Sequence, residues 1–164
     1  MSYDLLVFDP SVAPRERAAF MQWFEAQTDW SEGEGTVEAL PEALRHWHQA
    51  MLPAWPDMQE VEDDRIDDPH VTGYSLGANV IYVDFRWSVA NEAYETVRRL
   101  AIEHRVGFYD VSGDEGDGEI YFPGDEPNPP SGGAWRQIAD QFKSLEDTPA
   151  TPKASWLNIF RRTQ

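Results

Sequence analysis

The segment 79–123 constrains the fold of this chain more than any other. From Asn79 to Trp87 apolar side chains alternate with polar ones, which is the period-two pattern of a strand with one face on a core. Ser88 then stands where its hydroxyl can cap a helix, and an apolar stripe at helical spacing follows over 89–104. Two further strands are expected at 106–111 and 119–122. The segment therefore predicts strand, helix, strand, turn and strand.

The rest of the chain adds strands and helices on both sides of this unit. A short apolar strand is expected at 3–8, and Pro14 and Pro41 suit the first turns of two helices. A strand at 71–76 and an amphipathic helix at 134–145 complete the order β-α-α-β-β-α-β-β-α. This order predicts an α+β fold: a single domain with a mostly antiparallel sheet of four to five strands. We expect the split β-α-β, ferredoxin-like arrangement, with helices packed on one face of the sheet.

Length and composition set the expected domain organisation. A chain of 164 residues is long enough for one domain with a substantial core. We expect an α+β core domain at 1–123, a linker rich in Pro and Gly at 124–133, a C-terminal amphipathic helix at 134–147, and a tail at 148–164.

The strongest global feature is charge, because 30 acidic side chains oppose 13 basic ones and give a net charge of −17. Binding to phosphate groups needs an excess of Lys and Arg, so neither nucleic acid nor a membrane is expected as a partner. A basic protein partner is expected, unless the acidity serves only solubility. The N-terminus lacks the features of a signal peptide and no apolar run could span a bilayer, so a cytoplasmic location is expected.

The sequence offers no motif for catalysis, metal binding or a cofactor. The absence of Cys excludes thiolate metal sites and cysteine nucleophiles. The acidic stretch 110–119 fails as an EF-hand, because Glu115 stands at the sixth position, where that loop needs Gly. His46 and His48 lie two residues apart on a predicted helix and so point to different faces. We therefore predict no catalytic residue, no metal site and no cofactor.

The binding features concentrate around residues 57–68, DMQEVEDDRIDD, which hold seven acids and one Arg. This run has no helical or strand periodicity, so an exposed loop is predicted. Trp55 and Met58 adjoin it, and Trp is a favoured anchor in protein interfaces. The residues predicted to contact a basic partner are Trp55, Asp57, Glu60, Asp63, Asp64, Asp67 and Asp68.

Two other functions remain open at this point. Tyr82, Asp84 and Arg86 share one face of the central predicted strand, where they could line the cleft of a hydrolase or another small-ligand enzyme. A cross-strand ion pair on a solvated face explains the same three residues without any activity. The third possibility is a nucleic-acid mimic whose carboxylates imitate phosphates, although the acids are scattered along the chain.

Three stretches resemble a group of small, acidic bacterial proteins: YDLLVFDP at 3–10, AWPD at 54–57, and 80–111 with its Trp-Ser helix entry and closing HRVGFYD. The resemblance covers most of residues 1–123. Such proteins look like immunity proteins of type VI secretion or contact-dependent toxin systems. The resemblance implies that this chain binds and neutralises a bacterial toxin domain by occluding its active site. It transfers no functional residue and identifies neither the toxin nor the oligomeric state.

Overall fold

The computed structural model describes residues 1–113, 118–126 and 134–148. These ranges contain five strands: β1 (Tyr3–Phe8), β2 (Gly73–Leu76), β3 (Val80–Phe85), β4 (Gly107–Tyr109) and β5 (Ile120–Tyr121). They also contain four α-helices: α1 (Arg17–Gln27), α2 (Glu42–Met51), α3 (Ala90–His104) and α4 (Trp135–Glu146). The predicted α+β class is therefore confirmed.

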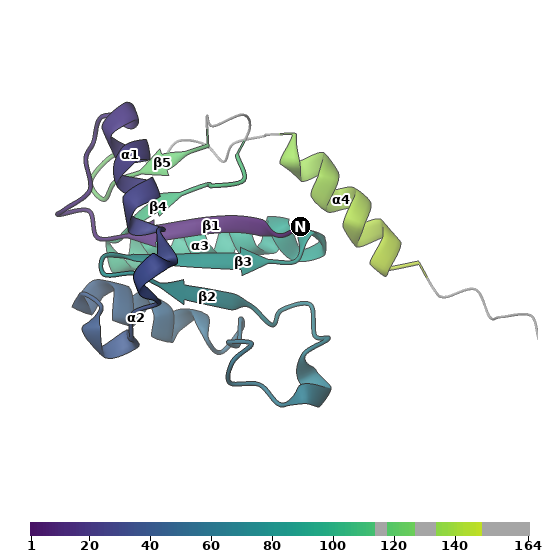
Figure 1. Cartoon of the computed structure of the whole chain (residues 1–164). Coiled ribbons are helices and arrows are strands. Elements are labelled where there is room, and N and C mark those ends of the chain that lie inside the picture. Colours follow the sequence, from purple (N-terminus) through teal and green to yellow (C-terminus); the bar gives the residue numbers. More distant parts are fainter. Residues whose placement is uncertain (114–117, 127–133, 149–164) are drawn as a thin grey trace, which may run out of the picture.

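The strands form one antiparallel sheet in the order β2-β3-β1-β4-β5 (Figure 1). Both β3 and β4 run antiparallel to β1, which lies between them, so they are parallel to each other and α3 makes the crossover. The register places Leu5 opposite Val83, and Val7 opposite Ile81 on one side and Phe108 on the other. This is the predicted split β-α-β arrangement, with β5 added at the β4 edge.

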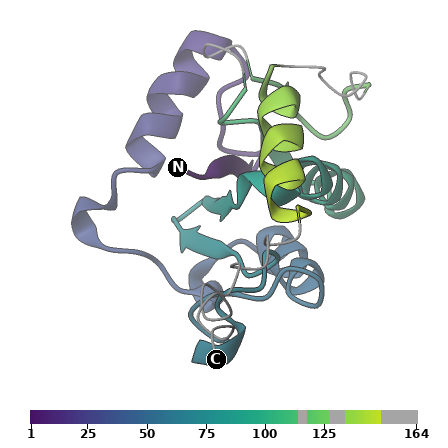
Figure 2. The same ribbon diagram turned by 90° about the vertical axis from the view of Figure 1, so that its right-hand side faces the viewer.

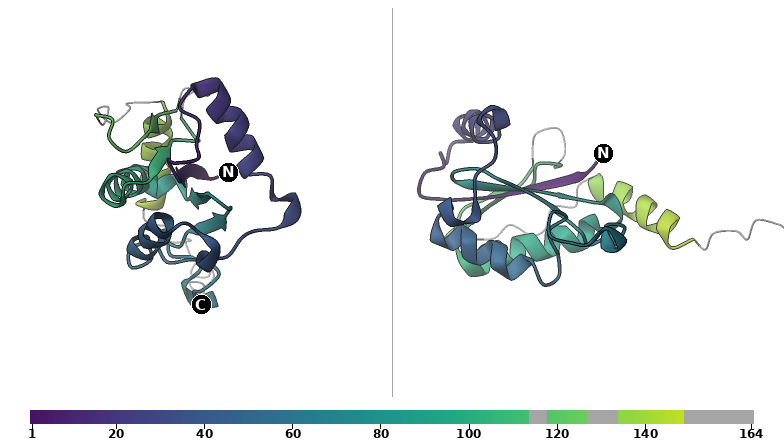
Figure 3. Two further views of the ribbon diagram at one scale, coloured as in Figure 1. Left: turned by 90° about the vertical axis from the view of Figure 1, so that its left-hand side faces the viewer. Right: turned by 60° about the horizontal axis from the view of Figure 1, so that its bottom comes forward.

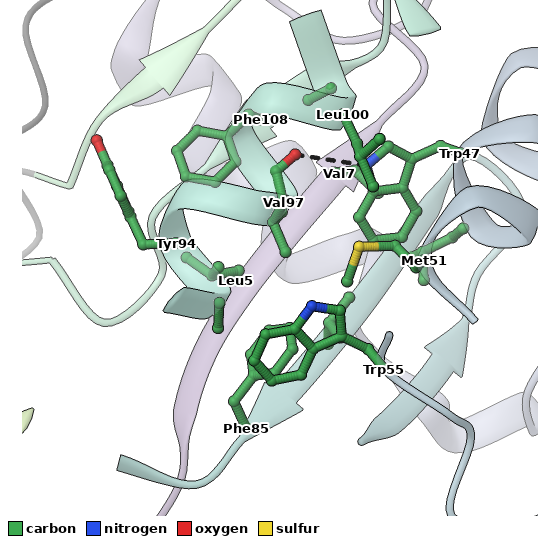
Figure 4. Packing of buried hydrophobic residues seen from close by; sticks show 14 of the residues in the cluster. Leu5, Val7, Trp47, Met51, Trp55, Phe85, Tyr94, Val97, Leu100 and Phe108 are labelled. Atoms are coloured by element: carbon green, nitrogen blue, oxygen red, sulfur yellow. Dashed lines mark hydrogen bonds between the residues drawn. The ribbon is translucent and has the colours of Figure 1, made fainter. Parts of the chain in front are cut away.

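The main core lies between one face of the sheet and helices α2, α3 and α4. Every second side chain along the central strands points into this core, because successive side chains of a strand point to opposite faces of the sheet. Trp47 of α2 is buried here, and its Nε1–H donates to the carbonyl oxygen of Val97 in α3 at 3.4 Å (Figure 4). This core joins α2 and α3 to the central strands as one unit.

Helix α1 packs on the opposite face, which differs from the expectation that the helices share one face (Figure 3, right-hand view). The reason lies in β1, because Leu6 and Phe8 are apolar on the face that points away from the main core. Both faces of this strand must therefore be covered. Phe20 of α1 supplies the cover, with its ring 5.1 Å from that of Phe8. The sequence predicts a helix here but not its side of the sheet, and Pro14 lies before the helix and not in its first turn, because Glu16 is the N-cap.

Helix α4 is part of the same domain, although a Pro/Gly-rich stretch precedes it. The indole of Trp135 packs against Tyr3 and Tyr94, with ring centroids 4.8 and 5.4 Å away. The helix lies at the end of the sheet where β1 begins (Figures 1 and 2). The predicted cap of α3 is wrong: Val89 stands at the N-cap, and the Ser88 hydroxyl makes no cap bond because a 3-10 turn at Trp87–Val89 precedes the helix. The predicted tail beyond Thr148 and residues 127–133 of the predicted linker lie outside the described residues.

Candidate partner-binding site

Residues 57–68, here called the acidic loop, connect α2 to β2 and project from the body beyond β2 (Figure 1). Backbone hydrogen bonds close the loop at its base. The Met58 N–H donates to the Thr72 carbonyl at 2.9 Å, and the Thr72 N–H donates to the Pro56 carbonyl at 3.0 Å. A 3-10 turn at Asp63–Arg65 shapes the tip. The loop is thus a folded element with its own backbone hydrogen bonds.

Trp55 fixes the base of the acidic loop from inside the core. Its side chain is only 1% exposed, and its indole packs edge-to-face on Phe85 at 5.0 Å (Figure 4). The His70 ring lies 4.8 Å from the same indole. The Tyr74 hydroxyl donates to its carbonyl oxygen at 2.7 Å. This burial corrects the prediction that Trp55 contacts a partner. The spacing of Met51 and Trp55, four residues apart, continues the buried stripe of α2 and is the sequence signal for this role.

His70 ties the end of the acidic loop to α3. Its Nε2 lies 3.2 Å from Glu92 Oε2, and its Nδ1 lies 3.5 Å from Asp68 Oδ1. The His70 backbone N–H also donates to Asp68 Oδ1 at 2.9 Å, which lowers the pKa of that carboxyl. Asp68 is a predicted contact residue, and the structure gives it this local role in holding the loop.

The other predicted contact acids differ in how far they reach solvent. Glu60, Asp63, Asp64 and Asp67 are exposed, and within the described residues none of the four has a hydrogen bond or ion pair through its side chain. Asp57 is half-buried, and its Oδ1 accepts the Gln59 N–H at 2.9 Å. The structure therefore brings the predicted acids together on one loop and leaves four of them available to a partner.

A groove borders the acidic loop and is here called the loop groove. Its volume is about 350 Å³. The residues that line it are Met1, Ser2, Met58, Ile66, Val71, Asp84, Phe85 and Arg86. Met58 and Ile66 remain 41% and 43% exposed, so apolar surface stands directly beside the acids. Arg86 Nη2 donates to the Ile66 carbonyl at 3.2 Å and so joins the end of β3 to the loop.

The predicted cleft residues Tyr82, Asp84 and Arg86 divide between two environments. The Tyr82 hydroxyl donates to Asp4 Oδ2 at 2.8 Å, and Asp4 is the direct cross-strand partner of Asp84. Partial burial raises the pKa of Asp84, and the carboxylates of Asp4 and Asp57 raise it further. Arg86 instead turns to the acidic loop. The sequence alone gives no sign that Asp4 lies beside Asp84, because only the strand register brings the two residues together.

No set of three or more His, Asp or Glu side chains within the described ranges is arranged to hold a metal ion. The helices found in those same ranges are all too short or too polar to cross a membrane. Comparison of the chain with protein-family models, with curated protein sequences and with solved structures finds no match. The interpretation of this surface therefore rests on its own geometry and charge.

Proposed function

We propose that this protein is an immunity-type protein that binds a basic bacterial toxin domain and neutralises it by covering the active site of the toxin. The observation that supports this most is the acidic loop, in which Glu60, Asp63, Asp64 and Asp67 are exposed on a folded segment tied to the core. The resemblance of three stretches to small acidic immunity proteins points in the same direction. A cytoplasmic location and a type VI or contact-dependent toxin are part of the proposal.

The physical case combines two contributions to binding. Clustered carboxylates raise the rate of encounter with a positively charged surface, and this steering weakens as salt screens the charges. The apolar side chains of Met58 and Ile66 add surface that a partner can desolvate, which supplies the affinity that exposed ion pairs lack. Because the loop is already folded, binding loses little conformational entropy.

A capture experiment tests the proposal. The full chain is immobilised and exposed to a lysate of its native cells at low and at moderate salt, and retained proteins are identified by mass spectrometry. We expect one stoichiometric basic protein that is released as salt rises and whose toxicity in cells disappears when this chain is co-expressed. A bait with Asp63, Asp64 and Asp67 all changed to Lys should retain much less of it. Absence of any partner, or a partner whose toxicity is unchanged by co-expression, would reject the proposal.

A further inference from the structure

The loop groove combines apolar walls with a carboxylate. Among its lining residues, Val71 and Phe85 are buried, while Met58 and Ile66 are exposed to solvent. Asp84 is the only acid among the lining residues. A long basic side chain matches this combination, because its methylene stem is apolar and its charged end lies at the tip.

The position of the Asp84 carboxylate is set by the sheet around it. Gly73 is its cross-strand partner on β2, and a Cβ at that position would collide with the Asp84 carboxylate. Glycine therefore leaves the space that the carboxylate occupies. On the other side Asp4 is its partner on β1. The strand pairing on both sides thus sets where Asp84 lies, and Asp84 is one of the residues that line the groove.

Two carboxylates act on Asp84 from nearby. Burial raises the pKa of Asp84, and the carboxylates of Asp4 and Asp57 raise it further. Arg86 also lines the groove, but its guanidinium donates to the Ile66 carbonyl oxygen on the loop side. A cation placed at Asp84 would relieve this repulsion and pair a half-buried carboxylate.

We propose that the loop groove accepts one long basic side chain of the partner, Arg or Lys, with its charged end at Asp84 and its stem between Met58 and Ile66. The inference rests on the proposed function, because it names the chemistry by which a basic partner is anchored. The Asp84 carboxylate would repel an acidic side chain in the groove. A purely apolar side chain would remove water from that carboxylate without forming an ion pair or a hydrogen bond with it. Arg has the advantage of a planar fork that can bind a carboxylate through two hydrogen bonds.

Methyl NMR tests the groove without any knowledge of the partner. The full chain is labelled with [13C-methyl]methionine, so that Met58 reports on the groove. The buried Met51 and the half-buried Met21 of α1, which do not line the groove, serve as references. The probes are N-acetyl-arginine N-methylamide and its citrulline counterpart, which has nearly the same shape but no charge. We expect the arginine probe to shift the Met58 signal saturably, with a Kd on the order of millimolar. Citrulline should shift it several-fold less.

Two variants make the test specific. Asp84→Asn keeps the side-chain shape and should weaken arginine binding about tenfold, as expected for a lost charged hydrogen bond. Ile66→Lys places a cation at an exposed lining position of the groove and should have a similar effect. Equal shifts with citrulline, or unchanged binding by both variants, would overturn the groove assignment. If the groove assignment fails, capture of a partner that depends on the acidic loop would still support the proposed function. If the arginine probe binds but no partner is captured, the groove assignment holds and the proposed function is rejected.

Discussion

Replacing Trp55 with Ala should reveal whether this residue holds the acidic loop or contacts a partner. Buried aromatic side chains remove about 150–250 Å² from water, which at about 25 cal/mol per Å² corresponds to roughly 4–6 kcal/mol. Measured Trp-to-Ala substitutions in cores cost about 3–5 kcal/mol. Since Trp55 is 1% exposed and packs on Phe85 and His70, we expect a loss of about 3–5 kcal/mol in the free energy of unfolding.

Urea unfolding followed by far-UV circular dichroism measures this loss. Trp55→Phe keeps an aromatic ring in the core and should lose clearly less than Trp55→Ala. Trp30→Ala is a matched control, because Trp30 is a partly exposed Trp in a 3-10 turn and its loss should cost much less. Exposed side chains usually cost less than about 1 kcal/mol in the free energy of unfolding when they are removed. A loss this small for Trp55→Ala would refute the assignment of Trp55 to the core and would make it a candidate contact residue again.

Three further predictions concern ionisable groups. The pKa of Asp84 is raised in the folded state, so the wild type loses stability as pH rises above about 4 and this carboxyl ionises. Asp84→Asn lacks this loss and should therefore be more stable than the wild type at pH 7, as measured by urea unfolding. Burial lowers the pKa of His48, so the free energy of unfolding should fall as pH drops below about 6.5. His48→Gln should lose this pH dependence. If the free energy of unfolding falls equally steeply with pH in the variant and in the wild type, the prediction is wrong. Glu119→Ala removes the carboxylate that Arg98 Nη2 contacts at 3.0 Å in a shielded site, and should cost about 3 kcal/mol in thermal or urea unfolding. A loss below about 1 kcal/mol would instead place that ion pair with ordinary exposed ones.

The sequence predicts the fold well where its periodicity is local. The alternation in 79–87 and the stripe in 89–104 define β3 and α3, because each element buries one face against the main core. The side of the sheet taken by α1 could not be predicted in the same way. Since β1 is apolar on both faces, its pattern does not show which helix covers which face.

The candidate site could be predicted only in part, for a physical reason. A run of charges indicates exposure, and the acidic loop is indeed exposed. The pairing of Asp4 with Asp84 and the position of Gly73 beside Asp84 depend on strand register, and residues distant in sequence carry no local signal of it. The loop groove draws on the loop, on β3 and on the N-terminus, so its apolar walls could not be assembled from spacing alone.

The proposed function requires that the acidic loop steers a basic partner onto this protein. The most direct test is the association rate with the captured partner, measured by stopped flow at increasing salt. The test variant changes Asp63, Asp64 and Asp67 to Lys, leaving out Asp68 because it holds the His70 backbone. The control changes Glu25, Glu38 and Glu95 to Lys, which are exposed acids elsewhere with the same change in net charge.

At low salt the loop variant should associate at least about tenfold more slowly than the wild type, and the gap should narrow as salt rises. The dissociation rate should change much less, and the control should remain close to the wild type. Equal association rates for the wild type and the loop variant, or an equal loss in the control, would contradict the assignment of the acidic loop as the binding surface.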